Sequence, residues 1–188
     1  MKATLFALVL SLTLALPALA KEKDVAGVKF PETSSAGGKE LKLNGAGLRT
    51  KAIFKVYAAG LYLETPTKDA AQAISSDQTK RVRMFMLRDL EKAKITDAIS
   101  EGMEKNNKAA MPALRERLDK LKGAVPDLKK GDELTITYIP GTGTQVQSKS
   151  GEALTLEGKD FADALFGVWL GAKPVDDDLK DGMLGKED

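Results

Sequence analysis

Residues 52–63 read Ala-Ile-Phe-Lys-Val-Tyr-Ala-Ala-Gly-Leu-Tyr-Leu, a nearly continuous apolar stretch rich in aromatic and β-branched residues. Such a run is typical of a strand buried on both faces, so we expect it to be the central strand of a sheet. Within it, Gly60 indicates a bulge or the close approach of another segment. Just upstream, residues 39–43 alternate polar and apolar residues, as half-buried strands do. Asn44-Gly45 between the two segments predicts a tight turn.

The rest of the chain combines further strands with helices. Apolar residues at helical spacing predict helices in the middle and at the end of the chain, and Gly/Pro turns separate short strands between them. The expected strands cover residues 28–43 (with a turn at 34–38), 52–63, 80–87, 133–139, 144–148 and 153–156, and the expected helices cover residues 67–74, 91–107, 111–121, 159–170 and 176–184. With no internal repeat and no linker, this pattern predicts one α+β domain.

The first twenty residues have the composition of an export signal. Lys2 precedes an apolar run over residues 5–16, and Pro17-Ala18-Leu19-Ala20 follows, which matches the positive start, short apolar centre and Ala-x-Ala end of a secretory signal peptide. The run is shorter than the ~20 residues of a membrane-spanning helix, so a retained anchor or a buried helix is the weaker alternative. We therefore expect a signal peptide over residues 1–20 and a single domain over residues 21–188. The mature protein is expected to be periplasmic, with secretion into the medium as the alternative, and not to span the membrane.

The chain of 188 residues contains no histidine and no cysteine. These absences exclude Ser-His-Asp triads, imidazole proton shuttles, disulfides, thiolate nucleophiles and metal sites built on His or Cys. Charge in a site must therefore be stabilised by Arg, Lys, hydroxyl or backbone N–H groups, and we expect no cofactor and no metal. Asp176-Asp177-Asp178 lacks the alternating spacing of a calcium loop and is expected to begin a helix. A net charge of +2 is too small to indicate nucleic-acid binding.

Several segments, taken in their order along the chain, resemble the chalcone isomerase fold family, and its exported bacterial branch in particular. They are residues 44–49 (Asn-Gly-Ala-Gly-Leu-Arg), 54–64, 86–89 (Met-Leu-Arg-Asp), 138–144 (Tyr-Ile-Pro-Gly-Thr-Gly-Thr), 158–162 (Gly-Lys-Asp-Phe-Ala) and 169–174 (Trp-Leu-Gly-Ala-Lys-Pro). The resemblance implies an antiparallel sheet with a layer of helices on one face, an open-faced β-sandwich. It also implies a cleft between sheet and helices that takes a hydrophobic ligand.

The same resemblance implies which residues form the site. In the plant isomerases an Arg after the Gly-x-Gly segment polarises the substrate oxygen, and plant relatives without isomerase activity use this Arg, with a Tyr, to hold a fatty-acid carboxylate. Arg49 matches that Arg, and Tyr57 stands at or near a Thr of the enzymes. The positions that supply Tyr, Asn and a C-terminal hydroxyl in the enzymes fall near Glu91, Ala98 and Val168. The cation is therefore retained, whereas the hydroxyls and the amide of the isomerases are not.

Arg49 is the first candidate for a binding residue. A guanidinium beside the most apolar strand needs an anionic partner, and its planar shape suits a carboxylate or an enolate. The alternative is a structural role, in which the side chain reaches the surface or forms an internal salt bridge with one of three acidic residues, Glu64, Asp89 or Glu91.

Tyr57 and Arg88 are the further candidates for ligand binding. Tyr57 and Tyr62 face opposite sides of a regular strand, and the family position favours Tyr57, with a core tyrosine as the alternative. Arg88 is either a second cation of the site or a solvated side chain next to Asp89, which would cap the following helix. Trp169 is expected to be a packing anchor. The residues that line an adaptable lipid cleft, or belong to the ordinary core, are Met84, Phe85, Met86, Met103 and Phe166.

Three functions follow as hypotheses. The first is non-catalytic binding of a small hydrophobic anion such as a fatty acid, with its carboxylate on Arg49 and with Tyr57 assisting. The second is an isomerase (an intramolecular lyase of the chalcone isomerase type) in which Arg49 is catalytic and stabilises an enolate together with water. The third is an envelope structural or partner-binding protein with a vestigial cleft. The retained cation and the missing hydroxyls favour the first hypothesis, while the ligand's identity and the oligomeric state stay open.

Overall fold

The computed structural model describes residues 22–149 and 153–186, so the expected secretory signal lies outside the described residues. Seven strands form one sheet in the order β3-β4-β5-β6-β7-β8-β9, and β1 pairs with β2 in a separate hairpin. All neighbouring strands are antiparallel. The strands are β1 (Glu22–Val25), β2 (Val28–Pro31), β3 (Thr33–Ala36), β4 (Lys39–Lys51), β5 (Phe54–Leu63), β6 (Lys80–Met86), β7 (Glu133–Ile139), β8 (Gly143–Ser148) and β9 (Leu154–Leu156).

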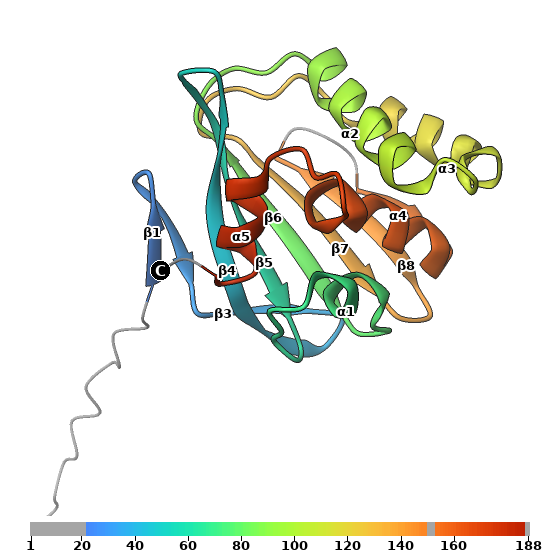
Figure 1. Ribbon diagram of the computed structural model, residues 1–188, viewed down its shortest axis with the longest axis horizontal. Helices are drawn as coiled ribbons and strands as arrows, with labels where there is room; N and C mark the ends of the chain where they lie inside the picture. Colours follow the sequence, from blue (N-terminus) through green and yellow to red (C-terminus); the bar gives the residue numbers. More distant parts are fainter. Residues whose placement is uncertain (1–21, 150–152, 187–188) are drawn as a thin grey trace, which may run out of the picture.

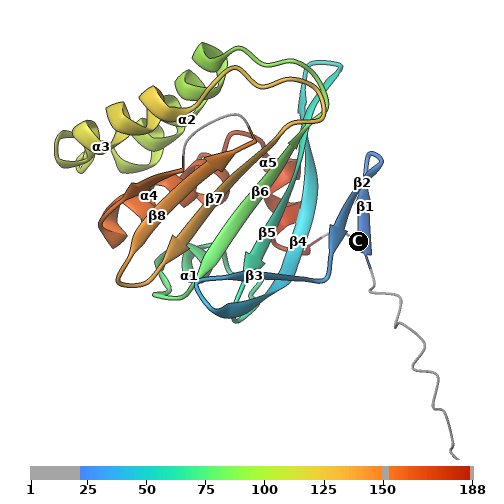
Figure 2. The ribbon, with the colours of Figure 1, turned by 180° about the vertical axis from the view of Figure 1, so that it is seen from behind.

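Helices lie on one side of this sheet, as Figure 1 shows from the helical side and Figure 2 from behind. They are α1 (Ala70–Ser75), α2 (Lys92–Asn107), α3 (Met111–Ala124), α4 (Lys159–Leu170) and α5 (Asp177–Met183). From Phe161 to its end α4 is almost entirely buried, because it lies between the sheet and the other helices. The expected α+β architecture, an antiparallel sheet with helices on one face, is confirmed.

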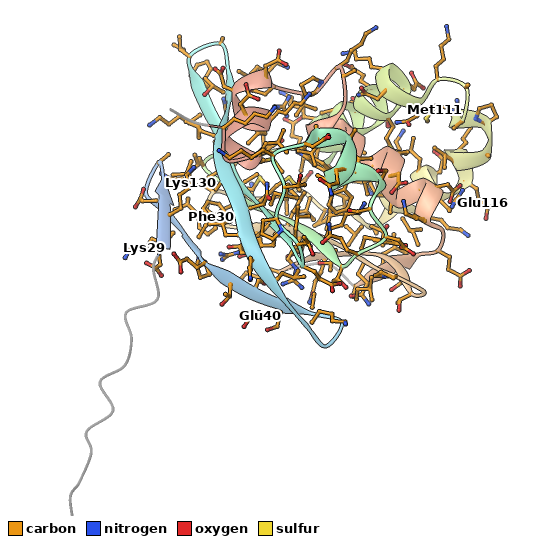
Figure 3. All side chains as sticks on the ribbon, turned by 60° about the horizontal axis from the view of Figure 1, so that its bottom comes forward. Lys29, Phe30, Glu40, Met111, Glu116 and Lys130 are labelled. Atoms are coloured by element: carbon orange, nitrogen blue, oxygen red, sulfur yellow. The ribbon has the colours of Figure 1, made fainter. Side chains whose placement is uncertain are left out.

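The apolar run that decides the fold is β5, and it is buried on both faces. Leu61 and Leu63 belong to the core between sheet and helices, whereas Ala58 and Tyr62 belong to a second core on the other face, beneath the β1–β2 hairpin. Of the two expectations for Gly60, close approach is confirmed, since a Cβ atom there would lie 2.7 Å from the ring of Phe30. Figure 3 shows Phe30 on the side of the β1–β2 hairpin that is turned toward the sheet.

The tight turn expected at Asn44-Gly45 is wrong. Strand β4 runs through this segment without interruption, and Asn44 forms a bulge because the pairing with β5 shifts there by one residue. The chain turns only at Ala52 and Ile53, so β5 begins at Phe54 and not at residue 52. Gly45 serves packing instead, because its Cβ would lie 2.3 Å from the carbonyl oxygen of Gly182 in α5.

From the sequence, acidic residues are expected to cap the N-termini of α5 and α2. Asp176 caps α5 by accepting the backbone N–H of Leu179 at 2.9 Å, as expected for the acidic run. The capping role expected for Asp89 is wrong, because α2 begins later, at Lys92. Asp89 instead accepts the backbone N–H of Lys130 at 2.9 Å and so ties the β6–α2 connection to the segment before β7.

Candidate functional site

A cavity of about 780 Å³ lies between the sheet and helices α2 and α4. Its apolar lining comes from three parts of the fold, namely the sheet (Val56, Met84, Met86, Leu134), α2 (Ile95, Ala98, Ile99) and α4 (Val168, Trp169). Its mouth is bordered by exposed charged side chains, namely Lys51, Arg88, Asp89, Glu91, Lys94, Asp97, Glu101, Asp127 and Lys129. This volume falls in the range of pockets that enclose small organic molecules, and the lining suits an apolar body with a polar end.

A β-bulge in β5 gives this cavity its polar end. Arg49 on β4 pairs with Tyr57, but the residue after Arg49 pairs with Lys55, so Val56 has no counterpart on β4. An extra residue in one strand breaks the alternation of side chains between the two faces. As a result Val56 and Tyr57 both line the cavity, and so does Phe54 beyond them. The bulge thus places the tyrosine and the arginine of a cross-strand pair at the same end of the cavity.

The Tyr57 hydroxyl is held by Trp169 of α4. The indole Nε1–H of Trp169 donates a hydrogen bond to the Tyr57 hydroxyl oxygen at 3.0 Å, and both side chains are buried. Burial raises the pKa of Tyr57 above its ordinary value of 10.0, an effect that the nearby Arg49 charge opposes. The phenol therefore stays protonated at neutral pH, and because its oxygen already accepts from Trp169, its proton is available to a ligand.

Arg49 lies partly buried beside this phenol. Its guanidinium carbon is 5.6 Å from the centre of the Tyr57 ring, within cation–π distance. One form of the structural alternative is a salt bridge with Glu64, Asp89 or Glu91, and the other is a side chain that reaches the surface. Glu64 instead accepts the backbone N–H of Thr79, and Asp89 pairs with Lys129. Among the residues that the structure describes, no salt bridge includes Arg49.

One carboxylate does approach this end of the cavity. Asp176 accepts the backbone N–H of Thr50 at 3.3 Å, next to Arg49 in the chain, and its charge contributes to the raised pKa of Tyr57. Its other oxygen is occupied by the cap of α5. The Asp176 carboxylate therefore connects α5 to the end of β4, and in the described part of the chain it forms no direct ion pair with the guanidinium.

Arg88 also lines the cavity, as an exposed side chain at its mouth. Its guanidinium carbon lies 5.0 Å from the centre of the Phe54 ring. Tyr62 lies on the opposite face of the sheet, as the alternation predicts, where its hydroxyl donates to the carbonyl oxygen of Pro31 at 3.1 Å. The structure therefore brings Arg49 and Tyr57 together, places Arg88 nearby and separates Tyr62 from them.

The three positions that the family resemblance matches to polar groups of the isomerases also lie at this cavity. Glu91, Ala98 and Val168 all line it. They supply one exposed carboxylate at the mouth and two apolar surfaces, where the resemblance predicts hydroxyl and amide groups in the enzymes. The arrangement can hold an anion and an apolar chain, but these positions offer no hydroxyl or amide to orient a reacting water.

Sequence reasoning missed part of the site. Trp169, expected only as a packing anchor, also lines the cavity and holds Tyr57. No local pattern signals this contact, because the two residues are 112 positions apart. Of the five Met and Phe candidates, Met84 and Met86 line the cavity. The remaining three lie in the core beneath the helices (Met103, Phe166) or on the other face of the sheet (Phe85).

The fold and the cavity together define a class of protein, in which a curved antiparallel sheet and one helical layer enclose an apolar pocket with an arginine at one end. The chain belongs to the chalcone isomerase-like family, whose model matches residues 22–185. A comparison with curated protein sequences finds no match. Among solved structures, the chain is similar to a fatty-acid binding protein of Arabidopsis thaliana, with a TM-score of 0.63 and 14% sequence identity over 85% of this chain and 93% of that chain. At this identity the likeness concerns the fold.

None of the helices in the described part of the chain combines the length and the apolar composition needed to cross a lipid bilayer.

Proposed function

We propose that this protein binds a fatty acid or a similar hydrophobic anion in the cavity. The observation that carries the proposal is a cavity with apolar walls from the sheet, α2 and α4 that is also lined by Arg49, whose guanidinium forms no salt bridge among the described residues. A guanidinium binds a carboxylate through two parallel hydrogen bonds, and an apolar lining favours a hydrocarbon chain. A fatty acid carries both groups.

Tyr57 and Arg88 have distinct roles in this proposal. Tyr57 donates its free proton to the carboxylate that Arg49 holds, because the two side chains are a cross-strand pair at the same end of the cavity. Arg88 is exposed at the mouth, where its charge attracts an anion before it enters.

Two observations favour binding without catalysis. Glu91, Ala98 and Val168 line the cavity at the positions that the resemblance matches to the catalytic hydroxyl and amide groups, and the solved structure of similar fold is described as a fatty-acid binding protein. A vestigial cleft would be expected to be filled, whereas this cavity has a volume of about 780 Å³.

We further propose that the chain is exported to the periplasm. N-terminal sequencing of the mature protein from a periplasmic fraction is then expected to begin at Lys21.

Binding is tested with the purified mature chain and a matched pair of ligands, a saturated fatty acid and the alcohol of equal chain length. The wild type is expected to bind the acid more tightly than the alcohol. Arg49→Ala is expected to lose about 1.5–3 kcal/mol for the acid, the range for a hydrogen bond to a charged group, and to bind the alcohol nearly as before. Native mass spectrometry of the gently purified wild type is expected to show a co-purifying lipid.

Arg115→Ala is the matched control, because Arg115 is exposed on α3 and does not line the cavity. This variant is expected to bind both ligands like the wild type. Equal affinities of wild type and Arg49→Ala for the acid, with no co-purifying lipid, would contradict the proposal.

A further inference from the structure

The turn between β4 and β5 is the most exposed apolar point of the described chain. The side chains of Ile53 and Phe54 are 86% and 55% exposed and are the large hydrophobic residues that the described part of the chain leaves open to solvent. Figure 1 shows this turn projecting beyond the neighbouring strands, at the end of the sheet where α2 begins. Adjacent exposed apolar side chains of this size mark an interaction site more often than a random surface.

Basic side chains surround this tip. Between residues 41 and 63 the chain contains no Asp or Glu, and Lys51 and Lys55 stand on either side of the apolar segment Ala52-Ile53-Phe54. Arg88 adds a third positive charge from the end of β6, with its guanidinium 5.0 Å from the Phe54 ring. Among the described residues, none of these three cations takes part in a salt bridge.

The acidic groups near the tip do not cancel this charge. Asp89, which follows Arg88, is neutralised by Lys129 at 3.1 Å. Across the mouth, α2 and the segments before it and before β7 carry both signs, with Lys94 among Glu91, Asp97, Glu101 and Asp127. The positive charge is therefore concentrated on the hairpin side, next to the exposed apolar residues.

We propose that this tip, formed by Lys51, Ile53, Phe54, Lys55 and Arg88, docks on the surface of a bilayer that contains anionic phospholipids. Aliphatic and aromatic side chains flanked by basic residues insert at the boundary between headgroups and acyl chains, while the basic groups pair with lipid phosphates. A soluble phosphate would match the cations and leave Ile53 and Phe54 exposed, so the lipid surface fits the tip better.

The location of the tip relates docking to the cavity. Lys51 and Phe54 belong both to the tip and to the lining of the cavity. A docked molecule therefore has the mouth of its cavity at the bilayer surface, where hydrophobic anions are concentrated. Docking itself does not depend on what occupies the cavity, so it is measured with the protein free of added fatty acid.

The test is co-sedimentation of the mature protein with vesicles of phosphatidylethanolamine and phosphatidylglycerol, compared with vesicles of phosphatidylcholine alone. Binding is expected only to the anionic vesicles and is expected to weaken in high salt. Lys55→Glu should lower partitioning at least tenfold, because each basic group near an anionic surface contributes roughly fivefold and the reversal changes the charge by two. Ile53→Ser should lower it by about tenfold through the lost apolar insertion.

Lys108→Glu is the matched control, an equal change of charge at the exposed turn between α2 and α3. It is expected to bind vesicles nearly like the wild type, and an effect as large as that of Lys55→Glu would overturn the proposal. Equal binding to neutral vesicles, or none to anionic ones, would overturn it as well. Self-association that Ile53→Ser abolishes, without vesicle binding, would assign the tip to a protein contact instead.

Measuring fatty-acid affinity in solution distinguishes failure of membrane docking from failure of the proposed ligand binding. Ile53 and Lys55 do not line the cavity, so both variants are expected to bind the fatty acid like the wild type while they lose vesicle binding. Vesicle binding without fatty-acid binding would leave the docking surface standing and refute only the ligand.

Discussion

Tyr57→Phe tests the buried hydrogen bond that joins the sheet to α4 at the polar end of the cavity. The indole N–H of Trp169 donates to the Tyr57 hydroxyl at 3.0 Å, and both residues are buried at the wall of the cavity. The substitution removes one oxygen atom and leaves the indole N–H without this acceptor. A buried donor left unpaired costs about 1–3 kcal/mol, so we expect the free energy of unfolding to fall by this amount.

The assay is urea unfolding of the mature chain and of a double-mutant cycle with Trp169→Phe. With a denaturant slope of about 1–3 kcal/mol/M, a loss of 2 kcal/mol lowers the midpoint by roughly 1 M. Trp169→Phe is expected to cost more than Tyr57→Phe, because it also leaves a space where the larger indole packed. Since both substitutions remove the same bond, the double variant should cost less than the sum of the two by about 1 kcal/mol.

Tyr62→Phe supplies the control on the same strand. The Tyr62 hydroxyl donates to the Pro31 carbonyl on the opposite face, so its loss should add to that of Trp169→Phe without coupling. Strict additivity of Tyr57→Phe and Trp169→Phe would refute the reasoning. Coupling of the same size in the Tyr62 cycle would also refute it, because the effect would then not belong to this bond.

Further predictions concern packing, pH and catalysis. In thermal or urea unfolding, Gly45→Ala should lower the free energy of unfolding by about 1–3 kcal/mol, since its new Cβ would lie 2.3 Å from the Gly182 carbonyl oxygen. In the same assay, Gly123→Ala in α3 should raise it by about 0.5–1 kcal/mol, because the new Cβ meets open space. Burial and the hydrogen bond to Asp77 raise the pKa of Tyr138 from 10.0 to about 12. As the pH rises, the unfolded chain therefore loses this proton before the folded chain does. The contribution of the protonated phenol to the stability of the fold is present below pH 10 and is lost as the pH rises toward 12. The excess stability of wild type over Tyr138→Phe should therefore be smaller at about pH 11 than at about pH 9, and an equal or larger excess at the higher pH would contradict the assignment. Incubation of the wild type with a chalcone should show only the spontaneous rate of ring closure, and an acceleration would favour the isomerase hypothesis over binding alone.

The sequence is sufficient to predict most strands of the sheet, because burial leaves a pattern in them. An element covered on both faces is apolar at nearly every position, and β5 was recognisable for this reason. The same physics identifies α3, where Leu114, Leu118 and Leu121 repeat at helical spacing and are all buried. Such signals are local, so they predict the element and not what the element contacts.

The features that the sequence did not predict depend on contacts between residues that lie far apart in the chain. Asn44-Gly45 has the composition of a turn, yet its glycine is needed by α5, more than 130 residues away, for the close approach of two backbones. Arg49 could be placed at the site only through the family resemblance, because an arginine beside an apolar strand is equally compatible with a surface position. The contact of Trp169 with Tyr57 leaves no trace in either neighbourhood of the sequence.

The bulge at Val56 has a consequence for how this hairpin tolerates change. By adding one residue it shifts the phase of the inward and outward positions, so that Phe54 faces the cavity and Lys55 faces away from it. If β5 instead continued its regular alternation through Val56, the two would exchange, which would turn Lys55 toward the cavity and Phe54 away from it. Deletion of Val56 keeps Thr50 paired with Lys55 and Lys51 paired with Phe54, so both side chains stay on their present faces. What this hairpin must keep is therefore its register with β4, more than its length.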